Sequence, residues 1–277
     1  MNVTESLARL DRDFSGDLSV YARRMDDGET IRYRAAEVTP AASTLKTIVL
    51  AEVYRQAHEG AFALTDPNRL VRESVEQTYG SGVLRDLTIG LTLSIRDMCV
   101  LMMAVSDNVA TNQLIQLVGF DSINEMAHRL GMKNTRIMRE MFHLGEDSQI
   151  PFGETTAEDF GTLFASLCKG QVVSPQASKA MLDMMMLNHY KLDIIRYFPP
   201  ELLLSERPAS DPLVRVASKS GTSRGVKCNA GVVFAPDCYY VIALFSRNGT
   251  DLTPTVDNES QIVLPKASRV VYDAYCG

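Results

Sequence analysis

Residues 41–50 read Ala-Ala-Ser-Thr-Leu-Lys-Thr-Ile-Val-Leu, a stretch that sets a serine and a lysine three residues apart at the start of an apolar helical run. On a helix this spacing places Ser43 and Lys46 on one face. A serine hydroxyl is a useful nucleophile at neutral pH only when a base takes its proton. A lysine can act as that base when desolvation or a nearby cation lowers its pKa. Because the apolar flank would desolvate Lys46, the stretch predicts a nucleophilic serine with its proton partner.

The same spacing occurs a second time, at Ser166-Leu-Cys-Lys169. There Lys169 is followed by Gly170, a pattern typical of a cationic last helical turn and its glycine cap. We therefore interpret the second copy as structural. The spacing alone is weak evidence, so Ser43 needs support from other parts of the chain.

Composition limits the class of protein. The chain has 277 residues, of which 45% are hydrophobic and 22% charged, enough for one or two compact lobes that need no disulfide or metal to fold. A net charge of -6 argues against a general nucleic-acid-binding protein. The five cysteines are scattered without a Cys-x-x-Cys pair, and we interpret them as buried or inactive thiols. The four histidines share no metal-ligand spacing, so no metal site is predicted.

The sequence gives two indications of compartment. Residues 1–12 lack the basic start and the apolar core of a secretory signal, which predicts a cytoplasmic protein for the chain as written. Removal of a leader would instead make a periplasmic or secreted location the expectation. No apolar stretch reaches the roughly 18 residues of a membrane span, so no membrane association is predicted.

Hydrophobic periodicity predicts an α+β protein. An amphipathic helix over residues 4–14 precedes a β-hairpin that turns at Asp26-Asp27-Gly28, and a mostly helical region follows from about residue 44 to 168. Strand patterns return at residues 213–218, 230–234 and 239–245, before a closing helix over 260–275. Strands at both chain ends predict one antiparallel sheet built from both. We expect residues 1–42 and 190–277 to form a discontinuous α/β lobe and residues 43–189 a helical lobe, with the site between them.

Two further motifs could support Ser43. Ser106-Asp107-Asn108 lies between two helical runs, where a simple helix N-cap is an equally good interpretation. Lys219-Ser220-Gly221 ends a predicted strand, where the glycine could simply let another backbone come close. Neither motif is specific alone.

Taken in order, the three motifs resemble those of the penicillin-recognising serine hydrolases, and class A β-lactamases most closely. The segments at residues 106–115 and 129–136 are similar to that pattern as well. The resemblance implies the β-lactamase/transpeptidase-like fold, with terminal helices against the sheet and an all-helical second lobe. It also implies an acyl-enzyme mechanism without a cofactor, acting on a small-molecule substrate.

Carried over to this chain, the resemblance implies a role for each matching residue. Ser43 would be acylated, Lys46 would be its proton partner, Ser106 would relay the proton to the leaving nitrogen, and Asn108 would bind the substrate amide. Lys219 would supply electrostatic potential, and the substrate carboxylate would lie against Ser220, Gly221 and Thr222, with Arg224 as a further ligand. The backbone N–H groups of Ser43 and Thr222 would form the oxyanion hole.

The chain departs from the family pattern in the loop after Arg136. Class A enzymes carry Arg-x-Glu-x-x-x-Asn there, and the glutamate activates the water that releases the acyl group. Here Met141 takes the glutamate position and Gly145 the asparagine position, while Glu140 stands one residue early. We expect Glu140 to be at best a partial replacement. An ion pair between Arg139 and Glu154 is expected to close the loop, in which His143 also falls.

Three hypotheses follow. The first is a serine hydrolase of the class A β-lactamase type that turns over β-lactams or related amides and esters. The second is a penicillin-binding or sensor-like protein that is acylated and deacylates slowly. The third is an intracellular esterase or peptidase that acts on a non-antibiotic metabolite.

Overall fold

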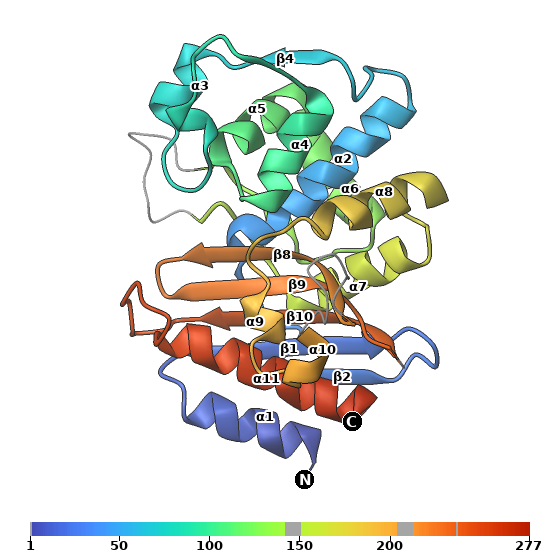
Figure 1. Cartoon of the computed structure of the whole chain (residues 1–277), viewed down its shortest axis with the longest axis vertical. Helices are drawn as coiled ribbons and strands as arrows, with labels where there is room; N and C mark the ends of the chain where they lie inside the picture. The colour runs from blue at the N-terminus through green and yellow to red at the C-terminus, as the bar shows by residue number, and fades with distance from the viewer. Residues whose placement is uncertain (1, 142–150, 204–212, 237) are drawn as a thin grey trace.

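A five-stranded antiparallel sheet forms the centre of the computed structural model, which describes residues 2–141, 151–203, 213–236 and 238–277 (Figure 1). Its order is β2-β1-β10-β9-β8. The strands are β1 (Asp17–Arg24), β2 (Thr30–Tyr33), β8 (Arg215–Ser223), β9 (Val226–Phe234) and β10 (Tyr239–Arg247). The pairing of β1 with β10 joins the two chain ends in one sheet and confirms the predicted α+β fold.

Helices from the two chain ends cover one face of the sheet, in front of and below it in Figure 1. They are α1 (Val3–Arg12) and α11 (Glu259–Cys276). The short helices α9 (Leu192–Ile195) and α10 (Pro200–Leu203) lie on the same face. Leu7, Ile242 and Leu264 are completely buried between these helices and the sheet. Alternate strand residues point to this face because successive strand side chains alternate.

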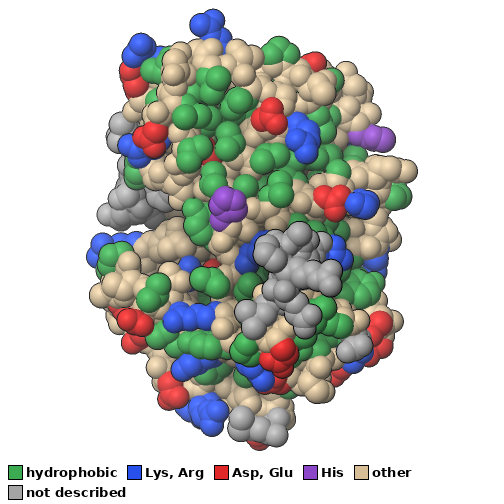
Figure 2. All heavy atoms as spheres, in the orientation of Figure 1, with side chains coloured by type: hydrophobic (Ala, Val, Ile, Leu, Met, Phe, Trp, Pro, Cys, Tyr) green, Lys and Arg blue, Asp and Glu red, His purple; other side chains and the backbone are tan. Residues whose placement is uncertain are grey.

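The helical lobe covers the other face. It contains α2 (Lys46–His58), α3 (Arg72–Gln77), α4 (Ile95–Ala104), α5 (Asn108–Val118), α6 (Phe120–Arg129), α7 (Ala157–Cys168) and α8 (Pro175–Met185). Helix α7 lies directly on the sheet, and a Cβ at Gly161 would come within 2.1 Å of the Tyr21 ring. Hydrophobic side chains spread over this lobe in the upper half of Figure 2, while Lys and Arg are more numerous over the sheet and outer helices.

Short elements connect the lobes beside the predicted nucleophile. The strand β3 (Thr39–Pro40) pairs with β7 (Gly153–Thr155), which pairs with β6 (Arg136–Ile137). The 3₁₀ helix η1 (Ala42–Leu45) follows β3 and leads into α2. Elsewhere β4 (Pro67–Arg69) pairs with β5 (Thr92–Ser94), and η2 (Leu84–Asp86) lies between these two strands in the chain.

Local predictions from the sequence were largely confirmed. The hairpin turns at Gly28, which has a φ of 81°, and Lys169 is the C-cap of α7 with Gly170 at φ 69°. Both glycines use backbone conformations that other residues rarely adopt. The lobe boundaries at residues 42/43 and 189/190 stay a prediction. No helix among the described residues is long and apolar enough to cross a membrane.

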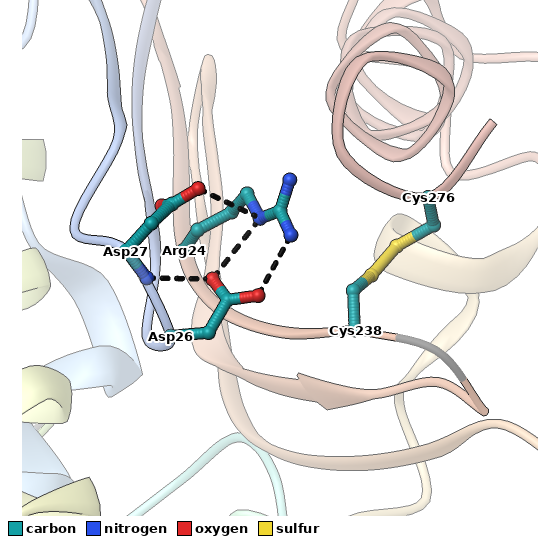
Figure 3. The surroundings of a disulfide bond; sticks show 5 residues. All are labelled: Arg24, Asp26, Asp27, Cys238 and Cys276. Carbon is teal, nitrogen blue, oxygen red and sulfur yellow. Dashed lines mark hydrogen bonds and ion pairs between the residues drawn. A yellow bond between two sulfur atoms is a disulfide. The ribbon is translucent and has the colours of Figure 1, made fainter.

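The interpretation of all five cysteines as thiols was wrong. Cys238, at the start of β10, and Cys276, at the end of α11, form a disulfide, while Cys99, Cys168 and Cys228 are free. Figure 3 shows the bridge across from the β1–β2 turn, where Arg24 is held by Asp26 and Asp27. The two cysteines are 38 residues apart, so only the docking of α11 brings them together.

Candidate active site

Ser43 lies in η1, at the junction between the helical lobe and the sheet, and only 7% of its surface is exposed. The residue before it, Ala42, has a φ of 44°, a left-handed conformation that costs a non-glycine residue about 1–3 kcal/mol. The segment is held in place by a hydrogen bond from Ala41 N to Gly153 O at 2.9 Å. The surrounding structure therefore imposes a strained backbone immediately before the predicted nucleophile.

The backbone of β8 approaches Ser43 closely at Gly221. A Cβ on Gly221 would come within 2.8 Å of Ser43 N and 3.0 Å of Ala42 Cβ. Only glycine fits here, which confirms the close backbone approach considered for the Lys-Ser-Gly motif. Thr222, the next residue, lines the same cavity as Ser43.

Lys46 is completely buried at the start of α2, and its ammonium nitrogen contacts the second motif. Lys46 Nζ lies 2.7 Å from Ser106 O, 3.1 Å from Ser106 Oγ and 2.7 Å from Asn108 Oδ1. Within the described part of the chain, no hydrogen bond joins Lys46 Nζ to Ser43 Oγ. The hydrogen-bond partners of Lys46 Nζ are therefore Ser106 and Asn108.

Burial changes the proton affinity of both site lysines. The pKa of Lys46 is lowered well below its ordinary value, mainly by desolvation and further by the charge of Lys219, against an opposing effect of Asp107. Desolvation also lowers the pKa of Lys219 to about 7, and its Nζ donates to Ser220 O at 2.8 Å. A neutral Lys46 can accept a proton, which is what a base for Ser43 must do.

The Ser106-Asp107-Asn108 motif serves both interpretations offered for it. Asp107 is the N-cap of α5, and its carboxylate also accepts hydrogen bonds from Val83 N and Leu84 N. Ser106 has a φ of 58°, which turns it and Asn108 toward Lys46. Asp107 therefore fixes the loop, while its two neighbours face the site.

A cavity of about 200 Å³ opens at this point. Its walls come from both lobes and consist of Ser43, Ser81, Ser106, Tyr190, Ser220, Gly221, Thr222 and Lys227. The structure thus brings together Ser43, Ser106 and the Ser220–Thr222 segment, as the sequence predicted. Arg224 does not line this cavity and lines a neighbouring one instead.

Three of the lining residues, Ser81, Tyr190 and Lys227, were missed by sequence reasoning. Lys227 pairs in register with Thr222 across the β8–β9 hairpin, so a strand alignment could have found it. The buried carboxylate of Asp193 holds its ammonium group at 3.3 Å. Ser81 and Tyr190 lie on connections between helices, where no local pattern indicates a site.

The loop that departs from the family pattern presents Met141 to the interior. Met141 is only 2% exposed, and its backbone is held on both sides by Asn112, through Met141 N to Asn112 Oδ1 at 2.8 Å and Asn112 Nδ2 to Met141 O at 3.0 Å. Asn112 lies four residues after Asn108 on α5, hence on the same helix face as the Lys46 contact. The Met141 backbone is therefore held by a residue one helical turn along α5 from Asn108, the residue that contacts Lys46.

Glu140 lies differently. Its half-exposed carboxylate accepts a hydrogen bond from Gln116 Nε2 at 3.2 Å, and it does not line the 200 Å³ cavity. The expected Arg139–Glu154 ion pair was wrong, because Glu154 pairs with Arg136 at 3.2 Å across the β6–β7 strands. His143 and Gly145 fall outside the described residues. Those residues contain no group of three or more His, Cys, Asp or Glu side chains that could hold a metal ion.

Comparison with known proteins identifies the family. Residues 2–275 match the model of the β-lactamase enzyme family. A β-lactamase of Streptomyces lavendulae is 25% identical over 85% of this chain and 75% of its own, and one of Streptomyces albus G is 26% identical over 83% and 72%.

Solved structures agree in fold. The β-lactamase of Sphaerobacter thermophilus is 29% identical, with a TM-score of 0.85 over 98% of this chain and 96% of its own. The L158E variant of PBP-A, solved as an acyl-enzyme with penicillin G, is 23% identical, with a TM-score of 0.82 over 98% and 95%. The chain belongs to the β-lactamase enzyme family and is a serine hydrolase of the class A type.

Proposed function

We propose that the protein opens β-lactam rings by transferring their acyl group to Ser43. The observation that carries this proposal is the buried Lys46, whose pKa is lowered by desolvation and whose Nζ lies 3.1 Å from Ser106 Oγ, beside a cavity lined by both Ser43 and Ser106. The names of the relatives, which are β-lactamases, support the choice of substrate class.

In the acylation step, Ser43 Oγ attacks the lactam carbonyl carbon, and its proton passes to neutral Lys46. The C–N bond then breaks, and the ring nitrogen takes a proton from Ser106, which Lys46 replenishes. The negative charge that develops on the carbonyl oxygen is stabilised by the Ser43 and Thr222 N–H groups, each contributing about 3–4 kcal/mol. The Lys46–Ser106 contact supports this route because it joins the two proton-transfer groups directly.

Release of the acyl group is proposed to be the slow step. A buried methionine, Met141, occupies the loop position at which the family pattern has its glutamate and offers no base for water, while the Glu140 carboxylate accepts a hydrogen bond from Gln116. Loss of a positioned base typically costs about 10²–10⁴-fold in rate. This favours a protein that is acylated readily and turns over slowly. Such kinetics correspond to the second hypothesis, a penicillin-binding protein that deacylates slowly.

Nitrocefin turnover combined with intact-mass spectrometry tests both statements. We expect a rapid mass increase of one acyl group, absent in Ser43→Ala, followed by slow release. Rapid turnover without an observable adduct would contradict only the proposal of slow deacylation and would leave the acylation of Ser43 in place. If neither turnover nor an adduct were observed, the β-lactam proposal would be contradicted, and an esterase or peptidase would be favoured instead.

The disulfide bears on compartment. Disulfides persist in oxidising surroundings and are rare in the reducing cytosol. We infer from Cys238–Cys276 that the protein works outside the reducing cytoplasm, contrary to the expectation from residues 1–12. Thiol trapping with a maleimide in freshly lysed source cells should leave Cys238 and Cys276 unlabelled after denaturation. Labelling of both cysteines would show that they are reduced in the cell and would contradict this inference.

A further inference from the structure

A second cavity adjoins the one that holds Ser43. It has a volume of about 340 Å³ and lies between the β8–β9 turn, at residues 223–226, and the segment from Asp251 to the start of α11. Thr222 and Lys227 line both cavities. A ligand bound at Ser43 can therefore extend past these two residues into the second cavity, which we call the turn cavity.

The walls of the turn cavity are fixed before any ligand binds. Gly249 N donates to Gly225 O at 3.0 Å and so ties the hairpin turn to the chain that follows β10. On the opposite wall, Asn258 Nδ2 donates to Asp251 O and Thr253 O at 2.9 and 3.1 Å. A preformed cavity costs a ligand little ordering free energy.

Cationic side chains outnumber carboxylates in the lining of the turn cavity. Its charged lining residues are Arg224, Lys227 and Asp251. The Asp251 carboxylate is occupied by Thr253 N and Glu259 N, and Lys227 is balanced by Asp193. Among the described residues, the exposed Arg224 has no ion-pair partner, so its charge is available to a ligand.

We propose that the turn cavity is a subsite for a carboxylate-bearing arm of an extended acyl substrate, bound by Arg224 with Lys227 at its entrance. This inference rests on the proposed acylation of Ser43 and narrows its substrate class to molecules with an anionic group beyond the one that faces Ser220. Arg224 is thus placed on an outer part of the substrate and not on the carboxylate next to the reacting ring.

The test compares two chromogenic cephalosporins that differ only in the end of the arm at ring position 3, which is a carboxylate in one and the matching primary amide in the other. The measured quantity is the ratio of their acylation rate constants at low substrate concentration. An exposed ion pair contributes up to about 1 kcal/mol, so we expect the wild type to favour the carboxylate about 2- to 5-fold, less at high salt. Arg224→Gln should bring the ratio near unity, and Arg224→Lys should retain most of it.

Arg9→Gln is the matched control, because Arg9 is an exposed arginine on α1 that lines neither the turn cavity nor the active-site cavity. It should leave the ratio at the wild-type value. Equal rates for the two probes in the wild type, or an equal fall of the ratio in Arg9→Gln, would overturn the subsite. Failure of both probes to label Ser43 would instead overturn the proposed acylation itself.

Discussion

At the level of single residues, the site is marked by two buried lysines whose pKa values are lowered. Lys46 and Lys219 are both fully buried, desolvation lowers the pKa of each, and the charge of Lys219 lowers the pKa of Lys46 further. Burying an amine without a carboxylate partner costs free energy that a structural role would not justify. The arrangement is typical of a site in which a lysine must accept a proton.

The assignment of the nucleophile gives the first prediction. Ser43→Ala should abolish both nitrocefin hydrolysis and covalent labelling, a loss of several orders of magnitude, because the nucleophile acts as one unit with its base. Ser166→Ala, in the second Ser-x-x-Lys, is the matched control and should retain near wild-type rates. If both variants lost activity equally, a folding defect and not the loss of a nucleophile would explain the result.

The lowered pKa of Lys219 gives a second prediction, about stability. Between pH 7 and its ordinary value of 10.5, the unfolded chain binds more protons than the folded one, so the free energy of unfolding should rise with pH. The contribution of one group is at most about 1.4 kcal/mol per pH unit. Urea unfolding from pH 7 to 9.5 should show a smaller slope in Lys219→Met. An unchanged slope would mean that Lys219 keeps its ordinary pKa in the folded protein.

Short elements carry the site residues. Ser43 lies in a 3₁₀ turn before α2, Ser106 and Asn108 lie at the start of α5, and Gly221 lies near the end of β8. Each motif was visible in the sequence because its chemistry coincides with the beginning or end of a periodic segment. Lys227 was not predicted because its position depends on the strand register across a hairpin. The turn cavity was not predicted because it depends on how residues 251–258 fold back.

The loop after β6 gives a prediction at this scale. Met141→Glu should place a carboxylate beside Asn112, one helical turn along α5 from Asn108, and thereby accelerate deacylation relative to the wild type. Decay of the acyl-enzyme after removal of excess penicillin, followed by intact mass, measures this rate. Glu140→Gln is the control and should change it little, since that carboxylate is held by Gln116. A collapse of turnover in Glu140→Gln would identify Glu140 as the base.

At the scale of the whole molecule, the disulfide connects the last helix to the sheet. Its loop spans 38 residues, for which chain entropy predicts a stabilisation of about 2–4 kcal/mol. Cys238→Ser should lower the free energy of unfolding by that amount in urea and make it insensitive to reductant. Cys168→Ser, which alters a free thiol in α7, should keep the wild-type response to reductant. A wild type whose stability did not change on reduction would contradict this contribution.

The sequence predicted the sheet from both chain ends because alternating strands are a local signal, and their joining follows from packing rules. It did not predict Cys238–Cys276 or the Arg136–Glu154 ion pair. Both depend on tertiary docking, of α11 against the sheet and of β6 against β7. These two missed features therefore depend on how separate elements dock, whereas the position of Lys227 in the active-site cavity depends on the register of one hairpin.

The pairing of β1 with β10 also affects how the protein is made. Asp17 pairs with Arg247, so the ribosome must add some 230 residues before β1 meets this neighbour in the sheet. At about 5–20 residues per second, the wait lasts roughly 12–46 s. During synthesis the β1–β2 hairpin has no third strand, and an isolated hairpin is marginally stable at best. Ribosome-bound chains stalled before β10 should thus remain sensitive to protease in residues 17–33, and protection should begin only after β10 has emerged.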